Sequence, residues 1–338
     1  MDLVKLKSVL QDEPKFRYKQ VWQAMFRDFI SSWQENTTLP ISLREKLDAE
    51  VSLQIDAQMF GSKDNDTIKA LITLEDGNRV EAVLLTHIDG RHTVCVSSQV
   101  GCPLGCTFCA TGKLGFKRNL TAGEIVDQIL FFNRHLLKTK GKEHKTNNVV
   151  FMGMGEPFLN YDNVMEAVRI INDKDGLNIG ARHISISTSG IIDGINKFAK
   201  EDLQVNLAIS LHAANDKLRA QLMPIDKKYP LGKMLRAVKS YVEKTDRQVM
   251  FEYLMIDGVN DTDKDIKDLI EIMDQPLYMV NLIRYNPTGG DFQPSTNEKI
   301  KKFKNALLRA GVKATQRYSM GDDIDAACGQ LSAKNAKQ

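Results

Sequence analysis

The stretch CVSSQVGCPLGCTFCATG at residues 95–112 decides the fold that this sequence predicts. It holds three cysteines, Cys102, Cys106 and Cys109, spaced as C-x3-C-x2-C. Three thiolates on one tight loop make an incomplete zinc site, because a structural zinc takes four ligands in a closed tetrahedron. A cube of four irons and four sulfurs can be held by three cysteines, with its fourth iron open to another ligand. The spacing therefore predicts an iron–sulfur cluster with an open, reactive iron.

The remaining two cysteines, Cys95 and Cys328, have no cysteine partner nearby in the sequence. A zinc site completed by Cys95 or by a histidine is the alternative to a cluster on the loop. Cys328 lies between Ala327 and Gly329, small residues that leave its sulfur accessible. A single cysteine is nevertheless by default an inert core residue. The residues alone leave the roles of both thiols open.

Beyond residue 100, apolar runs that favour strands alternate with longer stretches that favour helices. The strand-like runs lie at 148–152, 183–187, 205–210, 249–255 and 280–283. The helix-like stretches lie at 121–138, 162–172, 190–200, 231–244, 262–273 and 296–310. The first of them opens with Thr121 and, three residues later, Glu124, a capping box. This alternation predicts an α/β fold with a parallel sheet and right-handed crossovers, either an open doubly wound sheet or a barrel.

The pattern of apolar and β-branched residues divides the chain into four parts. Residues 1–52 predict an N-terminal helical accessory domain, because apolar residues recur there at helical spacing. Residues 53–87 predict a β-hairpin connector, with alternating β-branched segments around an EDGN turn. Residues 88–320 form the predicted core, and 321–338 a C-terminal segment with the fifth cysteine.

Bulk properties narrow the class of protein only a little. The length of 338 residues suggests about two domains. The sequence has 46 Lys and Arg residues and 43 Asp and Glu residues. The resulting net charge of +3 does not by itself indicate a nucleic-acid-binding protein. The sequence has no run of about 18 apolar residues and no signal-peptide pattern. Five cysteines, three of them crowded, fit a reducing compartment, and we expect a cytoplasmic protein without membrane attachment.

Four further stretches resemble one known family. They are FMGMGEP at 151–157, SISTSG at 185–190, SLHA at 210–213 and GDDIDAACGQL at 321–331. With the cysteine loop, they resemble in order and over roughly residues 79–331 the RlmN/Cfr adenine methyltransferases of RNA, which are radical S-adenosylmethionine (SAM) enzymes. The resemblance implies a partial (β/α)6 radical SAM barrel with a small N-terminal helical domain and a β-hairpin extension.

The same resemblance implies the cofactors, a [4Fe-4S] cluster on the three loop cysteines and SAM, used twice per turnover. SAM would chelate the open iron through its amino and carboxylate groups. The residues that the resemblance assigns to SAM binding are Gly155, Glu156, Ser187, Ser210, Leu211, His212 and Asn286. Taken without the resemblance, a glycine-rich turn after a strand is weak evidence of a ligand. A lone His212 is more often a packed core histidine.

Three catalytic residues follow from the resemblance. Cys328 would take a methyl group from one SAM, and a radical formed from a second SAM would remove hydrogen from that methyl before it adds to the adenine ring. Cys95 would then attack the sulfur of Cys328, releasing the methylated RNA and leaving a disulfide that a cellular reductant reopens. Glu81 matches the proposed acceptor of the ring proton. Taken alone, Glu81 is an ordinary glutamate on a hairpin.

The family's substrates are adenine 2503 of 23S rRNA, before or during ribosome assembly, and adenine 37 of some tRNAs. Four positions, Val100, Pro157, Ser189 and Asp322, favour the branch that methylates carbon 2, whereas NLIRYNPT at 281–288 is closer to the Cfr branch, which methylates carbon 8. A radical SAM enzyme for a non-RNA substrate and a silent RNA-binding relative are further alternatives. We also expect a monomer that receives electrons from a flavodoxin or ferredoxin.

Overall fold

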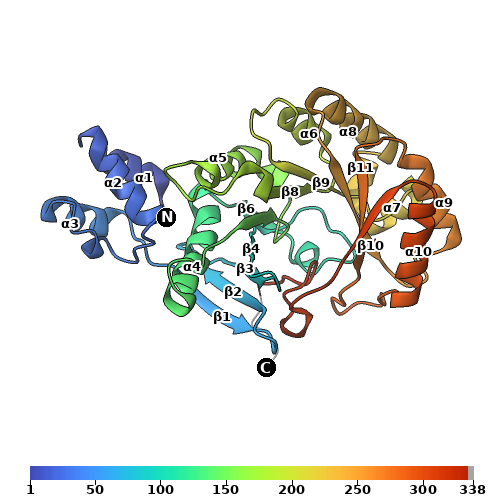
Figure 1. The fold of residues 1–338 in the computed structure, drawn as a ribbon, viewed down its shortest axis with the longest axis horizontal. Coiled ribbons are helices and arrows are strands. Elements are labelled where there is room, and N and C mark those ends of the chain that lie inside the picture. The colour runs from blue at the N-terminus through green and yellow to red at the C-terminus, as the bar shows by residue number, and fades with distance from the viewer. Residues whose placement is uncertain (334–338) are drawn as a thin grey trace.

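The computed structural model describes residues 1–333, and within them ten strands form one sheet. Its order is β1-β2-β3-β4-β7-β8-β9-β10-β11-β12. The first three strands are antiparallel to their neighbours, and every pairing from β4 to β12 is parallel. The parallel strands curve around the interior of the molecule (Figure 1). Because β1 and β12 end the order and do not pair with each other, the barrel is only partial. The fold class predicted from the sequence is confirmed.

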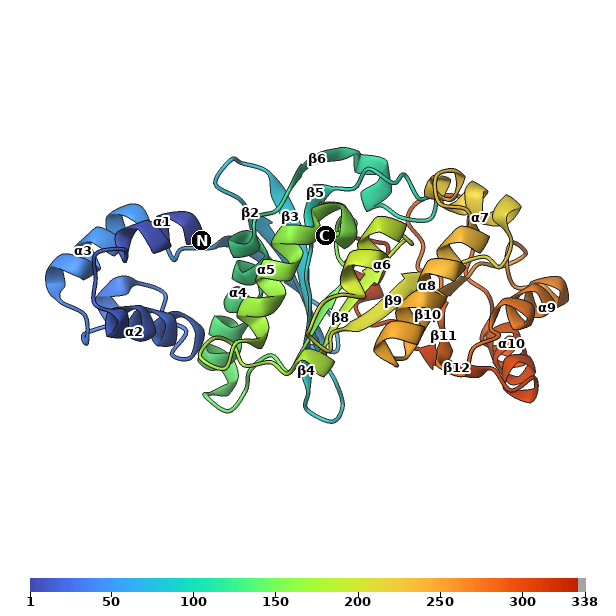
Figure 2. The same cartoon turned by 90° about the horizontal axis from the view of Figure 1, so that it is seen from above.

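The N-terminal helices lie at one end of the molecule, beyond the helices that cover the sheet (Figure 2). They are α1 (Leu3–Val9), α2 (Lys15–Phe26) and α3 (Ile41–Glu50). Trp33 is fully buried among them, and its indole nitrogen donates a hydrogen bond to the carbonyl of Val51 at 2.7 Å. The buried residues of these helices, Trp33 among them, belong to the same apolar core as the sheet and its covering helices.

An antiparallel meander follows the helices and leads into the barrel. Its strands are β1 (Asp56–Gly61), β2 (Thr67–Thr73), β3 (Arg79–Thr86) and β4 (His92–Cys95). The last of these pairs with β3 on one side and with the parallel strand β7 on the other. The meander therefore joins the barrel through a shared strand, so its side chains can reach the barrel's interior.

The barrel alternates strands and helices along the chain. After β4 come α4 (Ala122–Lys140), β7 (Asn148–Phe151), α5 (Tyr161–Asn172), β8 (Ile184–Thr188), α6 (Ile192–Phe198), β9 (Asn206–Ser210), α7 (Asp216–Leu222), α8 (Leu231–Thr245), β10 (Val249–Met255), α9 (Asp263–Ile272), β11 (Tyr278–Arg284), α10 (Asn297–Arg309) and β12 (Lys313–Arg317). A separate pair, β5 (Gln99–Gly101) and β6 (Phe116–Asn119), flanks the cysteine loop. Short 3₁₀ helices lie at Trp33–Glu35, Thr111–Leu114, Pro157–Asn160, Ala181–His183, Pro224–Lys227 and Asp322–Ile324.

The predicted capping box begins α4. The Thr121 hydroxyl accepts a hydrogen bond from the Glu124 amide at 3.2 Å, and the Glu124 carboxylate accepts one from the Thr121 amide at 2.9 Å. Both bonds satisfy amides that a helix start leaves without partners. None of the helices within residues 1–333 is long and apolar enough to cross a lipid bilayer.

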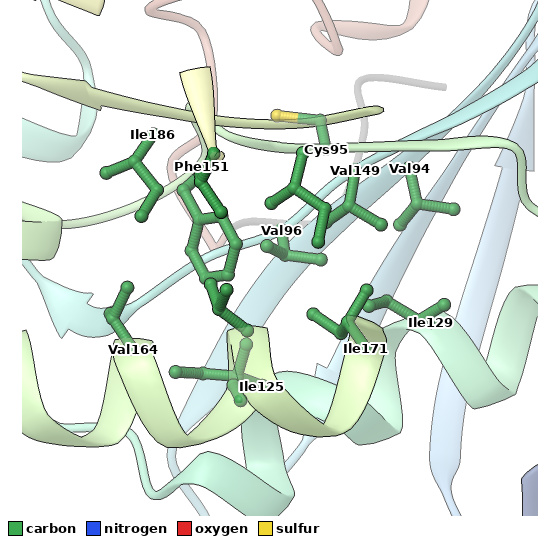
Figure 3. Packing of buried hydrophobic residues seen from close by; sticks show 14 of the residues in the cluster. Val94, Cys95, Val96, Ile125, Ile129, Val149, Phe151, Val164, Ile171 and Ile186 are labelled. Atoms are coloured by element: carbon green, nitrogen blue, oxygen red, sulfur yellow. The ribbon is translucent and has the colours of Figure 1, made fainter. Parts of the chain in front are cut away.

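The main core lies between the sheet and the helices on its outer face. Figure 3 shows Ile125 of α4 and Val164 of α5 packed against Phe151 of β7. Successive residues of a strand point to opposite faces, so Val94 turns toward these helices and Cys95 turns away from them. Apolar packing on the outer face thereby fixes which strand residues point to the interior, where the site lies.

Candidate active site

The cysteine loop is held by main-chain contacts. The amide of Cys102 donates a hydrogen bond to the carbonyl of Gly115 at 2.9 Å, and the amide of Thr107 donates one to the carbonyl of Leu222 at 3.0 Å. Gly101 has φ +74°, and a Cβ placed there would lie 1.8 Å from the Gly115 oxygen. Only glycine permits so close an approach of one backbone to another. The loop is therefore held in place by backbone contacts with Gly115 and Leu222.

Burial makes the loop thiols hard to ionise. Burial raises the pKa of Cys102 to about 12, and the nearby Cys109 thiol adds to the effect. Burial, followed by the neighbouring thiols Cys109 and Cys102, also raises the pKa of Cys106. Because the thiolate is the ligating form, a positively charged centre must offset both burial and mutual repulsion. This donor set fits an iron–sulfur cluster.

The loop thiols differ in arrangement from a site for one metal ion. All three line the same cavity, yet no three His, Cys, Asp or Glu side chains among residues 1–333 gather closely enough to hold a single ion. In a [4Fe-4S] cube each cysteine binds a separate iron. Cys95, which the zinc alternative could recruit, is not among the residues that line this cavity.

A first cavity of about 160 Å³ adjoins the cysteine loop at the interior of the barrel. Five of the residues predicted to bind SAM line it, namely Gly155, Glu156, Ser187, Ser210 and His212. Leu211 is fully buried and does not line it. Asn286 lines a second cavity, and its side-chain amide donates a hydrogen bond to the carbonyl of Cys328 at 3.3 Å.

The turn after β7 places Glu156 beside the loop. Gly155 has φ +99°, and a Cβ placed there would lie 2.5 Å from a side-chain carbon of Gln99. The Glu156 carboxylate accepts hydrogen bonds from the amide and hydroxyl of Ser189, both at 2.8 Å, and from the amide of Phe158 at 3.0 Å. Burial raises its pKa. Glu156 is thus already hydrogen-bonded within the protein through both carboxylate oxygens.

His212 follows β9 in a left-handed conformation, with φ +57°. Its Nδ1 accepts a hydrogen bond from the amide of Leu254 at 3.1 Å, and the ring of Phe108 meets it edge to face at 4.8 Å between centroids. Burial, with a contribution from Arg219, lowers its pKa to about 3. His212 is therefore neutral at physiological pH and presents an uncharged ring to the cavity.

Two buried charges at this site were missed by the sequence analysis. Arg219 is fully buried, pairs with Asp226 at 2.6 Å and donates a hydrogen bond to the carbonyl of Ser189 at 2.7 Å. Glu252 lines the first cavity, accepts a hydrogen bond from Asn281 at 2.8 Å, and has no partner for its Oε1. Glu252 interrupts the apolar run of β10, a signal that could have been noticed, because a charge inside such a strand requires a compensating partner.

A second cavity, of about 780 Å³, lies beside the first. Cys95, Arg317 and Cys328 line it. Four residues line both cavities, namely Met152, Ile283, Cys328 and Leu331. The structure therefore brings the two cysteines that are distant in sequence to one cavity and puts Cys328 at the junction with the cavity of the loop thiols.

Arg317 brings a positive charge to the cavity that both cysteines line. Burial raises the pKa of Cys95 to about 12, the Cys328 thiol adds to the rise, and Arg317 opposes it. The Cys328 thiol, Glu252 and Cys95 together raise the pKa of Arg317 against the effect of burial. Arg317 therefore favours the thiolate form of Cys95, which burial would keep neutral.

Glu81 lies outside both cavities. Its side chain is fully buried on β3 and pairs with Lys69 of β2 at 3.1 Å. Its other oxygen accepts hydrogen bonds from the amides of Ser332 at 2.6 Å and Ala333 at 3.0 Å. In this arrangement its carboxylate faces the C-terminal segment.

Comparison with known proteins gives consistent results. The family model described as Radical SAM superfamily matches residues 96–271. The protein named "Probable dual-specificity RNA methyltransferase RlmN" of Listeria welshimeri is 44% identical over 331 residues, which cover 96% of this chain and 90% of that protein. Its namesake from Dictyoglomus turgidum is 43% identical over 335 residues, covering 98% and 95%.

One solved structure is similar over nearly its whole length. The crystal structure of a radical SAM methyltransferase from Sphaerobacter thermophilus superposes with a TM-score of 0.94 at 42% identity, covering 99% of this chain and 98% of that one.

Proposed function

Because the chain belongs to the radical SAM superfamily and, within it, to the RlmN family, we propose that this SAM-dependent RNA methyltransferase acts on carbon 2 of adenine in both rRNA and tRNA. The substrate adenines are 2503 of 23S rRNA and 37 of certain tRNAs. Both relatives are named as dual-specificity RNA methyltransferases, which supports two kinds of RNA substrate.

The observation that carries the proposal is the junction of the two cavities at Cys328. The first cavity has the three loop thiols, and the second has Cys95 and Arg317. A sulfur at this junction can receive a methyl group from the first cavity and present it to a base in the second. A cluster enzyme without a protein-borne carrier would have no need of a thiol at that place.

Cys102, Cys106 and Cys109 would hold the [4Fe-4S] cluster, and the turn at Gly155 with Ser187, Ser210 and His212 would hold SAM. When bound, the cluster supplies the single electron that turns SAM into a radical source. The protein's own residues would bind the cluster and SAM, orient them and keep water out of the cavity. Glu252 offers one further acceptor, because its Oε1 lacks a partner.

Cys95 and Cys328 complete the reaction as a thiol pair. After the methyl carbon is bonded to both the adenine and Cys328, the Cys95 thiolate attacks the sulfur of Cys328. The sulfur–carbon bond then breaks, its electrons leave with the methyl carbon of the RNA, which takes up a proton, and a Cys95–Cys328 disulfide remains for a thiol reductant to reopen. Arg317 supports this step by favouring thiolate at Cys95.

Glu81 is the proposed acceptor of the ring proton. Its carboxylate is engaged by Lys69, Ser332 and Ala333 and is fully buried. Glu81 can therefore reach a base only after the contacts to the C-terminal segment open. A flavodoxin or ferredoxin as electron donor, a monomeric state and a cytoplasmic location complete the proposal.

The test is the position of the methyl group on RNA. Purified, cluster-loaded protein with SAM and a reductant is incubated with unmodified 23S rRNA or tRNA, and the nucleosides are analysed by mass spectrometry against 2-methyl- and 8-methyladenosine. We expect 2-methyladenosine from both RNAs. The 8-methyl isomer would instead support the Cfr-like activity, and unmodified RNA with consumed SAM would point to a substrate that is not RNA.

A further inference from the structure

One buried ion pair holds both ends of the loop that carries Cys328. Lys69 lies on β2 opposite Val83, and Glu81 lies on β3 opposite Leu71, so the two charged residues are diagonal neighbours on one face of the hairpin. Their side chains are 2% and 0% exposed, and the Lys69 ammonium lies 3.1 Å from Oε1 of Glu81. Charged side chains this deeply buried are rare unless they are paired.

Each charge of the pair also contacts the C-terminal segment. The Lys69 ammonium donates a hydrogen bond to the carbonyl of Asp325 at 3.2 Å. Oε2 of Glu81 accepts hydrogen bonds from the amides of Ser332 at 2.6 Å and Ala333 at 3.0 Å. Cys328 lies between these two attachment points. Figure 1 shows the C-terminal segment returning beside β2 and β3.

The other side of the same loop is attached to the cysteine loop. The amide of Ala110 donates a hydrogen bond to the carbonyl of Gly329 at 2.7 Å, and the hydroxyl of Thr111 donates one to the carbonyl of Leu331 at 2.6 Å. The segment 325–333 therefore spans from the hairpin to the proposed cluster loop. Movement at its hairpin end would displace the sulfur of Cys328 from the junction of the cavities.

In each contact the charged group has the hydrogen-bonding role that suits its charge: the ammonium donates and the carboxylate accepts. The Lys69 ammonium binds a carbonyl at the start of the loop, and the Glu81 carboxylate binds two amides at its end. Hydrogen bonds to charged groups are stronger than neutral ones, and burial strengthens them further. An ion pair that served only to join β2 to β3 would not need one carboxylate oxygen devoted to backbone amides 251 and 252 residues away.

We propose that Lys69 and Glu81 are positioning residues that clamp the two ends of the Cys328 loop and thereby hold its sulfur where it can receive a methyl group. The catalytic part of this inference rests on the proposed function, because it takes Cys328 as the methyl acceptor. The clamp itself is a statement about the folded protein and is measurable without turnover.

A reversal of the two charges separates the clamp from a merely structural pair. The double variant Lys69→Glu with Glu81→Lys keeps an ion pair inside the hairpin. It presents a carboxylate to the carbonyl of Asp325 and an ammonium to the amides of Ser332 and Ala333, so both contacts with the loop become repulsive. A role confined to joining β2 to β3 would survive this reversal, and a clamp would not.

The experiment compares cluster-loaded wild type, the reversed variant, and Lys302→Met as a matched control. Lys302 forms an exposed ion pair with Asp263 at 2.7 Å, far in sequence from the hairpin and the loop. Hydrogen exchange is measured at the amides of 330–333 by mass spectrometry, and the rate of Cys328 alkylation by iodoacetamide is read from the same samples. Circular dichroism and iron content report whether each protein is folded and loaded.

We expect the reversed variant to fold and keep its iron, while exchange at Ser332 and Ala333 accelerates at least about tenfold, the effect of losing one charged hydrogen bond. Alkylation of Cys328 should accelerate as well, and the Lys302→Met control should match wild type. Wild-type exchange in the reversed variant would overturn the clamp.

If the reversed variant does not fold, Lys69→Met with Glu81→Met provides the same test, because apolar residues of similar size often replace a buried pair without loss of stability. Methyl loading of Cys328 from labelled SAM then tests positioning: loading that stays at the wild-type rate in a loosened loop would overturn it. Absence of loading in wild type would refute the proposed function and leave the exchange result to decide the clamp.

Discussion

Cys95 on β4 and Cys328 on the C-terminal segment line the same cavity, and Arg317 of β12 interacts electrostatically with both. Burial, aided by Cys328, raises the pKa of Cys95 to about 12, so Cys95 is a neutral thiol at pH 7. Only the thiolate is alkylated, and we expect the rate of Cys95 alkylation to rise about tenfold per pH unit between pH 7 and 10. Peptide mass spectrometry after iodoacetamide treatment measures this rate.

Arg317→Met should slow that alkylation several-fold at a given pH, because the charge that favours the thiolate is lost, whereas Arg317→Lys should retain most of the rate. Alkylation of Cys95 that does not depend on pH, or that is equal in both variants, would contradict the role given to Arg317.

Cys95→Ala should trap the enzyme on its RNA. The variant retains Cys328 and the loop cysteines, so methyl transfer to the protein and addition to the base can proceed, but no thiol remains to break the link. We expect a covalent protein–RNA species that survives denaturing electrophoresis and shrinks to a nucleotide adduct on nuclease digestion. Ordinary turnover without an adduct would remove Cys95 from the reaction.

Cys328→Ala should abolish methylation while leaving the cluster intact. With SAM labelled in its methyl group, wild type should carry label on the peptide with DAACGQL, and the variant should carry none. A single turnover by pre-labelled wild type with unlabelled SAM should then give labelled RNA. If label reached RNA only from free SAM, Cys328 would be no more than a small residue at the junction.

Iron content should separate the two groups of cysteines. Reconstituted wild type should bind about four irons and four sulfides, as one [4Fe-4S] cluster requires. Alanine at Cys102, Cys106 or Cys109 should eliminate most of this iron, and alanine at Cys95 or Cys328 should spare it. One equivalent of zinc in anaerobically purified wild type, without iron uptake, would restore the zinc alternative.

Arg219→Met should be among the most destabilising substitutions near the site. It leaves Asp226 buried without its partner and frees the carbonyl of Ser189, and breaking such a pair costs about 3–5 kcal/mol of the free energy of unfolding. Arg169→Met, which breaks the pair between a half-exposed arginine and Glu201, should cost at most about 1 kcal/mol. Urea unfolding of both variants measures the difference, and equal losses would contradict the special place of Arg219.

Local signals predicted the barrel's elements closely. The run at 249–255 is β10, and the stretch predicted at 121–138 is α4 at Ala122–Lys140, where the capping box fixed the start. Alternating apolar residues and helix caps act over a few residues, so a sequence reveals them. β12 was not predicted, because its residues are mostly half-buried and its apolar pattern is short.

Contacts between segments that are distant in sequence limited how much of the site could be predicted. The loop cysteines could be predicted as cluster ligands because they lie within eight residues of one another. The contact of Lys69 with Asp325 joins residues 256 positions apart, and no local pattern indicates it. Leu211 carries the family's motif, but the left-handed turn at His212 leaves its side chain in the core. Arg317 was missed because a single arginine in a polar stretch has no distinguishing spacing.

The backbone contact of Gly101 with Gly115 has a consequence for the life of the protein in a cell. Zinc fingers unfold when they lose their metal, because the metal supplies their folding energy. Here the thiol loop is tied to β6 and to Leu222 by main-chain bonds that involve no metal. A chain made during iron starvation should therefore persist as a folded apoprotein, which proteases that degrade unfolded chains do not remove. It should regain activity when iron returns, without new synthesis.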